Sequence, residues 1–586
     1  MKEAHTNIPL KRYWELFATH IRPQKARFVL LTVLLLTSIG LQILNPQLMR
    51  YFIDSAVTGQ PLSSLILAAV AFVGIALLQQ VLGVSATYLG ENVAWTATNA
   101  LRAELARHCL SLDMSFHNNR SPGELIERID GDVAELSNFF SQLVIRVFGN
   151  LLLLAGVLVV LFFQDWRIGI AFTLFAVVAL AVLNRVRGLA IPYQKALRQA
   201  IADLTGFLEE RLAGTEDIRS SGAVDFVMNG LYKLQHVILG HQRKAWTRGM
   251  AVGMVGSSLL VVGNVIAVIA GYFLYQGGDF TIGTVYLVIY YINLMARPIR
   301  ELTQQTENLQ NIGAATERLA ELRRIEPKTV DGPGADFASG PLSLAFDDVT
   351  FAYVDGEPVL KNISFELEPG KVMGILGRTG SGKTTLARLV FRLYDTTEGF
   401  VELGGFAIRQ STLKALRQRV ALVTQDVQLF QASVRDNLTF FNRNIPDTKI
   451  LEVIEQLELS DWFDALPDGL DTRLETGGRS LSAGEGQLLA LARVFLRDPG
   501  LVILDEASSR LDPATEQRIE RAIDLLLRDR TALIIAHRLG TVERADHILI
   551  LEEGRVIEQG NREGLAQDPD SRFHNLLRTG LEEVLA

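Results

Sequence analysis

The stretch Gly377-Arg378-Thr379-Gly380-Ser381-Gly382-Lys383-Thr384 decides how the C-terminal half of this chain folds. It matches the phosphate-binding pattern G-x-x-x-x-G-K-[ST] at every specified position. The short apolar segment 371–376 before it predicts a buried strand, and residues 385–393 after it have helical apolar spacing. A strand, a glycine loop and a helix in this order direct backbone N–H groups and the positive helix end at phosphate oxygens. We expect Lys383 to contact the β- and γ-phosphates of a nucleotide and Thr384 to hold Mg²⁺.

The composition of the whole chain excludes some classes of protein. Its 586 residues allow several domains, and 48% of them are hydrophobic, which is high for a soluble protein. The formal net charge of −8 gives no basic excess, so no nucleic-acid partner is predicted. The single cysteine, Cys109, excludes an internal disulfide. The N-terminus lacks the pattern of a signal peptide.

Long apolar runs fill the N-terminal half, and each can cross the hydrocarbon core, which takes about 20 helical residues. The six predicted membrane spans are 28–52, 64–89, 141–163, 168–188, 252–275 and 282–304. Residues 8–26 mix aromatic and basic side chains and predict an N-terminal elbow helix on the membrane face, although an ordinary exposed helix would have the same pattern.

The distribution of Lys and Arg predicts the orientation of these spans. The turns 53–63 and 276–281 contain neither residue, whereas the N-terminal segment and the long segments 90–140 and 189–251 contain many. Basic segments stay on the cytoplasmic side, so both termini and both long segments are placed in the cytoplasm of a multi-pass protein of the cytoplasmic (inner) membrane. The long segments keep helical spacing and predict helical arms extending from the membrane.

Beyond residue 322 the pattern changes. Residues 323–341 contain three Pro and three Gly and predict a linker between a transmembrane domain, 1–322, and a nucleotide-binding domain, 342–586. The alternating strand and helix patterns of the second domain indicate an α/β fold with a parallel sheet. The predicted fold class is therefore an α-helical membrane domain followed by an α/β P-loop domain.

Polar side chains at the ends of predicted strands complete a candidate hydrolytic site. Asp505 and Glu506 end the apolar segment 501–504, where Asp505 would hold Mg²⁺ and Glu506 would orient or deprotonate the attacking water. His537 and Gln425 also follow apolar strands, at the edge where α/β sheets bind ligands. We expect His537 to contact the γ-phosphate and Gln425 to contact Mg²⁺ and the γ-phosphate. Tyr353, which precedes the phosphate loop in the sequence, could stack on adenine.

Taken together, these motifs resemble the ABC (ATP-binding cassette) exporter family, in which a half-transporter carries its membrane domain ahead of its nucleotide domain. The resemblance covers nearly the whole chain. It implies that Thr385 also binds the nucleotide, that Asp512 belongs to the D-loop Ser509–Asp512, and that short helices at the arm tips dock into the nucleotide domains. It also implies two chains, with ATP held between the Walker A loop of one chain and the signature segment of the other.

The signature segment departs from the family pattern Leu-Ser-Gly-Gly-Gln. This chain has Leu481, Ser482, Ala483, Gly484 and Glu485 at these positions. The methyl group of Ala483 and the charge of Glu485 would disfavour a polyanion there. We therefore expect this chain to work with a different half-transporter. It would contribute an intact half-site, made of Walker A (Gly377–Thr384) and Walker B (Leu501–Glu506), and a degenerate signature. A symmetric homodimer that tolerates both residues is the alternative.

The resulting hypothesis is a transport-coupled ATPase that exports an amphiphilic substrate, such as a drug, a lipid or a peptide, by alternating access. The alternative is an ATP-gated channel or a regulatory membrane subunit, although the intact Glu506 argues against pure regulation. A soluble ATPase is excluded by the six spans. Polar residues in the spans suit either an amphiphilic cargo or helix packing. They are Gln42, Asn45, Gln47, Gln79, Asn150, Asn264, Tyr290 and Asn293.

Overall fold

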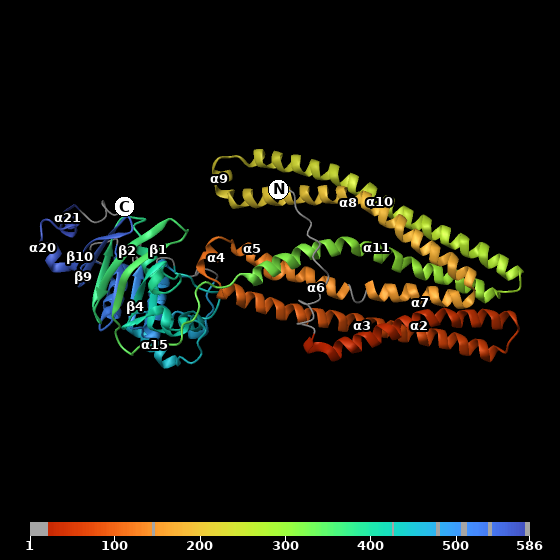
Figure 1. Ribbon diagram of the computed structural model, residues 1–586, viewed down its shortest axis with the longest axis horizontal. Helices are drawn as coiled ribbons and strands as arrows, with labels where there is room; N and C mark the ends of the chain where they lie inside the picture. The colour runs from red at the N-terminus through yellow and green to blue at the C-terminus, as the bar shows by residue number, and fades with distance from the viewer. Residues whose placement is uncertain are drawn as a thin grey trace. The chain divides into compact units, whose positions relative to one another are not determined.

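A computed structural model describes residues 22–142, 147–424, 427–475, 481–505, 513–536 and 542–579. The chain divides into two compact units (Figure 1). The first extends to Leu110 and resumes over Pro122–Ile325, and the second combines Ser111–Ser121 with the chain from Glu326 onwards.

The first unit is entirely helical among its described residues. Its elements are η1 (Arg22–Gln24), α2 (Lys25–Val57), α3 (Leu62–Ser111), α5 (Pro122–Ile126), the π-helix η2 (Glu127–Asp132), α6 (Val133–Gln142), α7 (Gly149–Gln164), α8 (Trp166–Ala213), α9 (Thr215–Ser220), α10 (Val224–Gln276) and α11 (Ile282–Arg324). Both predicted arms are continuous with membrane spans. The helices α3 and α8, of 50 and 48 residues, each run from a span into the arm that follows it, and α10, of 53 residues, runs from the second arm into the next span. The helices α8 and α10 pack along each other (Figure 1).

Five described helical segments are long and apolar enough to cross a membrane: Arg22–Val57, Leu62–Ser111, Trp166–Ala213, Val224–Gln276 and Ile282–Thr303. A shorter apolar helix, α7, overlaps the predicted span 141–163, which also includes the undescribed residues 143–146. The predicted elbow helix falls mostly on residues 1–21, which lie outside the described residues.

Several of the polar residues in the spans bond to other helices. Gln47 donates to the Tyr291 hydroxyl at 3.1 Å, and Asn150 donates to Glu301 at 2.6 Å. Asn264 and Asn293 bond to each other across α10 and α11, with Asn293 Nδ2 lying 3.1 Å from Asn264 Oδ1. Helix packing therefore explains these four polar side chains without any cargo.

An ion pair between a buried carboxylate and a half-exposed arginine joins η2 to the long helix α11. Asp132, at the end of η2, is 2% exposed, and its Oδ2 accepts a bond from Arg318 Nε at 2.9 Å. This bond raises the pKa of Arg318. Because the Asp132 carboxylate is buried, loss of this partner would leave it without an ion pair and would destabilise the helical unit.

The second unit contains two sheets. The 4-stranded sheet has the order β2-β1-β4-β5, and the 6-stranded sheet has the order β10-β9-β3-β8-β7-β6. The strands are β1 (Leu344–Ala352), β2 (Pro358–Leu367), β3 (Val372–Leu376), β4 (Glu398–Leu403), β5 (Phe406–Ala407), β6 (Val420–Val423), β7 (Leu501–Asp505), β8 (Thr531–Ile535), β9 (His547–Glu552) and β10 (Arg555–Asn561). Strands β9, β3, β8, β7 and β6 pair in parallel, and the other pairs are antiparallel. This confirms the predicted α/β fold.

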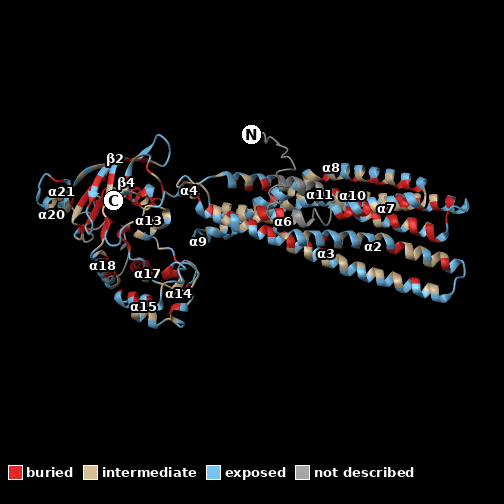
Figure 2. Cartoon of the chain, turned by 60° about the horizontal axis from the view of Figure 1, so that its bottom comes forward, coloured by how far each residue is buried: buried red, intermediate tan, exposed pale blue. Residues whose placement is uncertain are grey.

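Helices cover these sheets and complete the second unit. They are α4 (Met114–Asn118), α12 (Lys383–Val390), η4 (Ile408–Gln410), α13 (Leu413–Arg419), α14 (Val434–Thr439), α15 (Asp447–Gln456), α16 (Ser460–Asp464), η5 (Gly469–Asp471), α17 (Ala483–Arg497), α18 (Pro513–Leu527), α20 (Arg562–Gln567) and α21 (Arg572–Thr579). Buried residues gather in the strands of this unit and in α17 (Figure 2). All five residues of β3 and of β8 are buried, as expected for strands covered on both faces.

The Pro- and Gly-rich segment after α11 has no regular structure, yet it is bonded to the second unit. Asp331 accepts from the backbone N–H of Leu413 at 2.7 Å, and Gly332 N–H donates to Ser411 O at 3.1 Å. Arg392 donates to Val330 O at 2.8 Å. The segment is thus a strap fixed to the domain rather than a free tether.

Candidate nucleotide site

The phosphate loop lies between β3, in the middle of the larger sheet, and the start of α12. Gly377 and Gly382 have φ values of 150° and 107°. A Cβ on Gly377 would lie 2.2 Å from Leu551 O, and one on Gly382 would lie 2.5 Å from the Leu360 Cδ2 atom. Only glycine fits both the backbone angles and the space, so the loop is held tightly against β9 and β2.

The polar groups of this loop suit a polyphosphate. Lys383 is 6% exposed, and its Nζ donates to Gly377 O at 2.6 Å and to Arg378 O at 3.0 Å. Within the described part of the chain, the buried Ser381 hydroxyl has no hydrogen-bond partner. An unpaired buried hydroxyl costs free energy unless a ligand completes it. A phosphate oxygen would satisfy the Ser381 hydroxyl, and the Lys383 ammonium lies in the same loop to contact a phosphate oxygen.

Tyr353 lies beside the same helix. Its hydroxyl is 3.1 Å from Thr385 Oγ1 and accepts from Arg388 Nη1 at 3.2 Å. The side chain is 40% exposed, so it is accessible to a ligand. The structure therefore brings three of the predicted elements together: Tyr353, Thr385 and the phosphate loop.

Asp505 reaches the same edge of the sheet. It pairs in register with Ile535 of β8, and Ile535 pairs with Ile375 of β3. Strand β8 alone therefore separates β7, which ends at Asp505, from β3, which leads into the loop that begins at Gly377. Thr384, at the start of α12, is exposed. A hydroxyl and a carboxylate are oxygen ligands of the kind that Mg²⁺ takes, so both residues fit the predicted metal site.

Four predicted site residues lie outside the described residues: Gln425, Glu506, Asp512 and His537. The strands that precede three of them are as predicted. β6 ends at Val423, β7 at Asp505 and β8 at Ile535. All three strands are parallel, so their carboxyl ends lie at one edge of the sheet.

The altered signature forms the N-terminus of α17, and its charged residue is bonded to the helix start. Ser482 is the N-cap, and its hydroxyl accepts from the backbone N–H of Glu485 at 3.2 Å. The Glu485 carboxylate accepts in return from the Ser482 backbone N–H at 2.7 Å and from the Ser482 hydroxyl at 2.9 Å. This capping box was missed by our sequence analysis, although Ser-x-x-Glu before an apolar run is its known sequence signal.

The body of α17 is fixed by a buried cation. Arg493 is 8% exposed and donates to Asn437 O at 2.7 Å and to Gln428 O at 3.0 Å. Its guanidinium also lies 4.5 Å from the centre of the Phe440 ring. Burial lowers the pKa of Arg493 to about 10. The helix that presents Ser482 is thus attached to the segment that follows Gln425 in the sequence.

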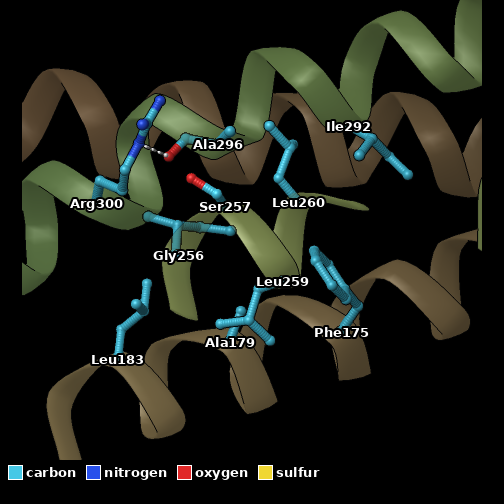
Figure 3. Close-up of a pocket in the computed structure, with 11 residues that line it drawn as sticks. Phe175, Ala179, Leu183, Gly256, Ser257, Leu259, Leu260, Ile292, Ala296 and Arg300 are labelled. Atoms are coloured by element: carbon cyan, nitrogen blue, oxygen red, sulfur yellow. Dashed lines mark hydrogen bonds between the residues drawn. The ribbon is translucent and has the colours of Figure 1, made fainter. Parts of the chain in front are cut away.

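A cavity that could be considered as a cargo site lies between α8, α10 and α11 of the helical unit (Figure 3). It measures about 40 Å³ and is lined mainly by apolar residues, with Ser257 and Arg300 among its walls. Arg300 Nε donates to Ala296 O at 3.3 Å, which holds the guanidinium near the helix it comes from (Figure 3). Sites for drug-sized ligands measure about 300–1,000 Å³, so this cavity is too small for an amphiphile.

Comparison with known proteins identifies relatives of both the helical half and the nucleotide-binding half of the chain. Residues 28–299 match the family model of the ABC transporter transmembrane region, and residues 360–509 match that of the ABC transporter. An ATP-dependent lipid A-core flippase of Idiomarina loihiensis is 30% identical over 96% of this chain and 97% of its own length. A putative multidrug export ATP-binding/permease protein of Bacillus subtilis is 28% identical over 97% of this chain and 98% of its own.

A solved structure of a bacterial Atm1-family ABC exporter with ATP bound has a similar fold. Its TM-score is 0.77 at 24% identity, and the match covers 95% of this chain and 98% of that one. At this identity the likeness supports the fold alone.

Proposed function

The chain belongs to the ABC transporter family, and on that premise we propose that it is one half of an exporter that moves an amphiphilic molecule, a lipid first of all, out of the cytoplasm. It is a multi-pass membrane protein and a transport-coupled ATPase. One observation carries the proposal most directly. In the part of the chain that the structure describes, a phosphate loop with a buried lysine and an unpaired serine hydroxyl lies on the same chain as five helical segments able to span a membrane.

We assign the roles around ATP as follows. Residues 377–385 hold the phosphates, Tyr353 stacks on adenine, and His537 contacts the γ-phosphate. Mg²⁺ would be held by Thr384, Asp505 and Gln425, and when bound it neutralises charge on the phosphate oxygens. Glu506 orients or deprotonates the attacking water, and Asp512 lies in the D-loop between the two nucleotide domains.

The proposed division of the chain is a membrane domain over 1–322, a linker over 323–341 and a nucleotide domain over 342–586. Both termini and both arms lie on the cytoplasmic side, where ATP is available, which agrees with the Lys and Arg distribution. Cargo chemistry is proposed from the relatives, because one is named a lipid A-core flippase. Several polar residues of the spans are already explained by helix packing.

Transport can be tested in inside-out membrane vesicles that contain the native partners of the chain. MgATP should drive a fluorescent phospholipid from the outer to the inner leaflet of these vesicles, and Lys383→Ala should abolish the movement. Lys414→Ala, which removes an exposed lysine from α13, is the control and should keep it. A channel or a regulatory subunit would give no ATP-driven, one-directional movement.

Half-transporters of this kind function as dimers, and we propose that the partner here is a different half-transporter. In a head-to-tail dimer, Ser482 faces the γ-phosphate bound by the partner chain. In this chain the Ser482 N–H and hydroxyl both donate to the Glu485 carboxylate. ATP would have to displace this internal anion, so a homodimer would have two weakened sites and a heterodimer only one.

Expression of the chain alone tests this assembly. We expect a species that hydrolyses MgATP poorly until a second half-transporter is co-expressed. A stable two-chain assembly of this chain alone, with substrate-stimulated hydrolysis at two equivalent sites, would rule out an obligate heterodimer.

A further inference from the structure

Three aromatic side chains form a small cluster beside the phosphate loop: Phe351, Tyr353 and Tyr394. The rings of Tyr353 and Tyr394 meet edge to face, with centroids 5.1 Å apart and planes at 86°. Phe351 contacts both, at 4.9 Å from Tyr353 and 5.6 Å from Tyr394. Phe351 and Tyr394 are 4% and 9% exposed, whereas Tyr353 is 40% exposed. Tyr353 is thus the accessible member of an otherwise buried cluster, and its orientation depends on its two neighbours.

The hydroxyl of Tyr394 leaves this cluster towards α4, at the tip of the first arm. It accepts a hydrogen bond from Asn118 Nδ2 at 2.9 Å. Burial raises the pKa of Tyr394, so the phenol stays neutral and can accept this bond throughout the physiological pH range. Asn118 is the last residue of α4, and the helix also buries Phe116 in the same unit.

The other end of α4 is bonded to the strap that follows α11. The Asp113 carboxylate accepts from the backbone N–H of Lys328 at 2.5 Å and from that of Thr329 at 3.0 Å. The arm tip is therefore held at two points, the aromatic cluster and the strap. A displacement of Tyr394 would act on one of the two attachments and leave the other in place.

We propose that Tyr394 and Asn118 are positioning residues that couple adenine occupancy at Tyr353 to the placement of the arm tip α4. The proposal rests on the proposed function, because it takes Tyr353 as the residue that stacks on adenine. A base on Tyr353 restricts its ring, the edge-to-face contact passes the restriction to Tyr394, and the bond to Asn118 passes it to α4. Three side chains thus connect the base of the nucleotide with the arm.

The test compares hydrogen exchange in residues 111–121 of the full-length chain with and without MgATP. All proteins carry Glu506→Gln, so that hydrolysis does not deplete the ligand. In this parent, MgATP should slow exchange in the segment. In Tyr394→Phe and in Asn118→Ala, the factor by which MgATP slows exchange in residues 111–121 should fall by roughly threefold to tenfold, which corresponds to the free energy of one side-chain hydrogen bond. The two changes combined should have no larger effect than either one, because both remove the same bond.

Asn119→Ala is the matched control. Asn119 is the next residue along, and its side-chain amide donates to Ser115 O at 3.0 Å, within the arm tip itself. It should leave the MgATP effect unchanged. Mg-tripolyphosphate, which binds the phosphate loop but has no base, should slow exchange in segment 111–121 much less than MgATP does.

The proposal is overturned if both variants keep the parent MgATP effect, if Asn119→Ala loses it equally, or if tripolyphosphate reproduces it. A failure of the proposed function gives a different result, since the parent itself would then not bind MgATP. Nucleotide affinity, measured by equilibrium binding, should stay within about twofold of the parent in Tyr394→Phe, because Tyr353 and the phosphate loop are intact.

Discussion

Replacing Glu485 by Gln should strengthen the altered signature rather than weaken it. The carboxylate accepts two bonds from Ser482, at 2.7 Å and 2.9 Å. A hydrogen bond to a charged group contributes about 1.5–3 kcal/mol, and a neutral one about 0.5–1.5 kcal/mol. Displacing the two neutral bonds of Gln would therefore cost roughly 1–2 kcal/mol less in total than displacing the two bonds of the carboxylate. This difference is kept small because Glu485 is only half-buried and its charge is partly screened by water. A phosphate would then bind this helix start about 5- to 30-fold more readily.

The fold should survive this change, because Gln also completes a capping box. The helix loses only the interaction of a negative charge with its dipole, about 0.3–1 kcal/mol. Glu485→Ala and Ser482→Ala serve as contrasting variants. The first removes the carboxylate and its two bonds to Ser482 but keeps the N-cap, and the second removes the N-cap hydroxyl, which is also the group proposed to contact ATP.

The assay measures ATP trapped by the full-length chain that carries Glu506→Gln, as a function of MgATP concentration. Adding Glu485→Gln should lower the concentration for half-maximal trapping by about 5- to 30-fold, and Ser482→Ala should raise it. An unchanged or higher half-maximal concentration with Glu485→Gln would refute the reasoning that the carboxylate competes with the phosphate.

Three other predictions concern the loop, the orientation and the arm. Lys383→Ala should weaken MgATP binding more than about tenfold, because the buried ammonium would otherwise contact phosphate oxygens, and unchanged affinity by equilibrium binding would remove its assigned role. A cysteine in 277–281 should react with an impermeant reagent from outside and one in 118–121 should not, whereas the reverse labelling would invert the topology. Asp132→Asn should lower the stability of the helical unit by about 1–3 kcal/mol, because it removes the charge from the buried group that bonds the half-exposed Arg318. An unchanged melting temperature in detergent would contradict this estimate.

The phosphate loop could be predicted from the sequence because its determinants are local. Gly377 and Gly382 are needed for backbone angles and close contacts within one short stretch. The parallel sheet could be predicted for a similar reason, since β3, β7 and β8 are short, continuous apolar segments. The capping box of Ser482 and Glu485 is equally local, because the pattern Ser-x-x-Glu before an apolar helix is enough to predict it.

The contacts of the arm tip could not be predicted in the same way. Asn118 and Tyr394 are separated by 276 residues, and Asp113 and Lys328 by 215. Nothing in the local pattern distinguishes Asn118 from its neighbour Asn119. Such pairs depend on the tertiary fold, where the entropy of closing a long loop is offset by the packing of whole domains.

The most direct test of the central claim, that ATP hydrolysis at this site powers transport, is to replace Glu506 by Gln in inside-out vesicles. The variant should bind MgATP as the parent does, hydrolyse it about 10²–10⁴-fold more slowly, and lose the ATP-driven movement of the fluorescent phospholipid. Glu520→Gln, on α18, is the control and should preserve hydrolysis and movement. If the Glu506 variant hydrolyses ATP and moves the lipid at the parent rate, the account is contradicted.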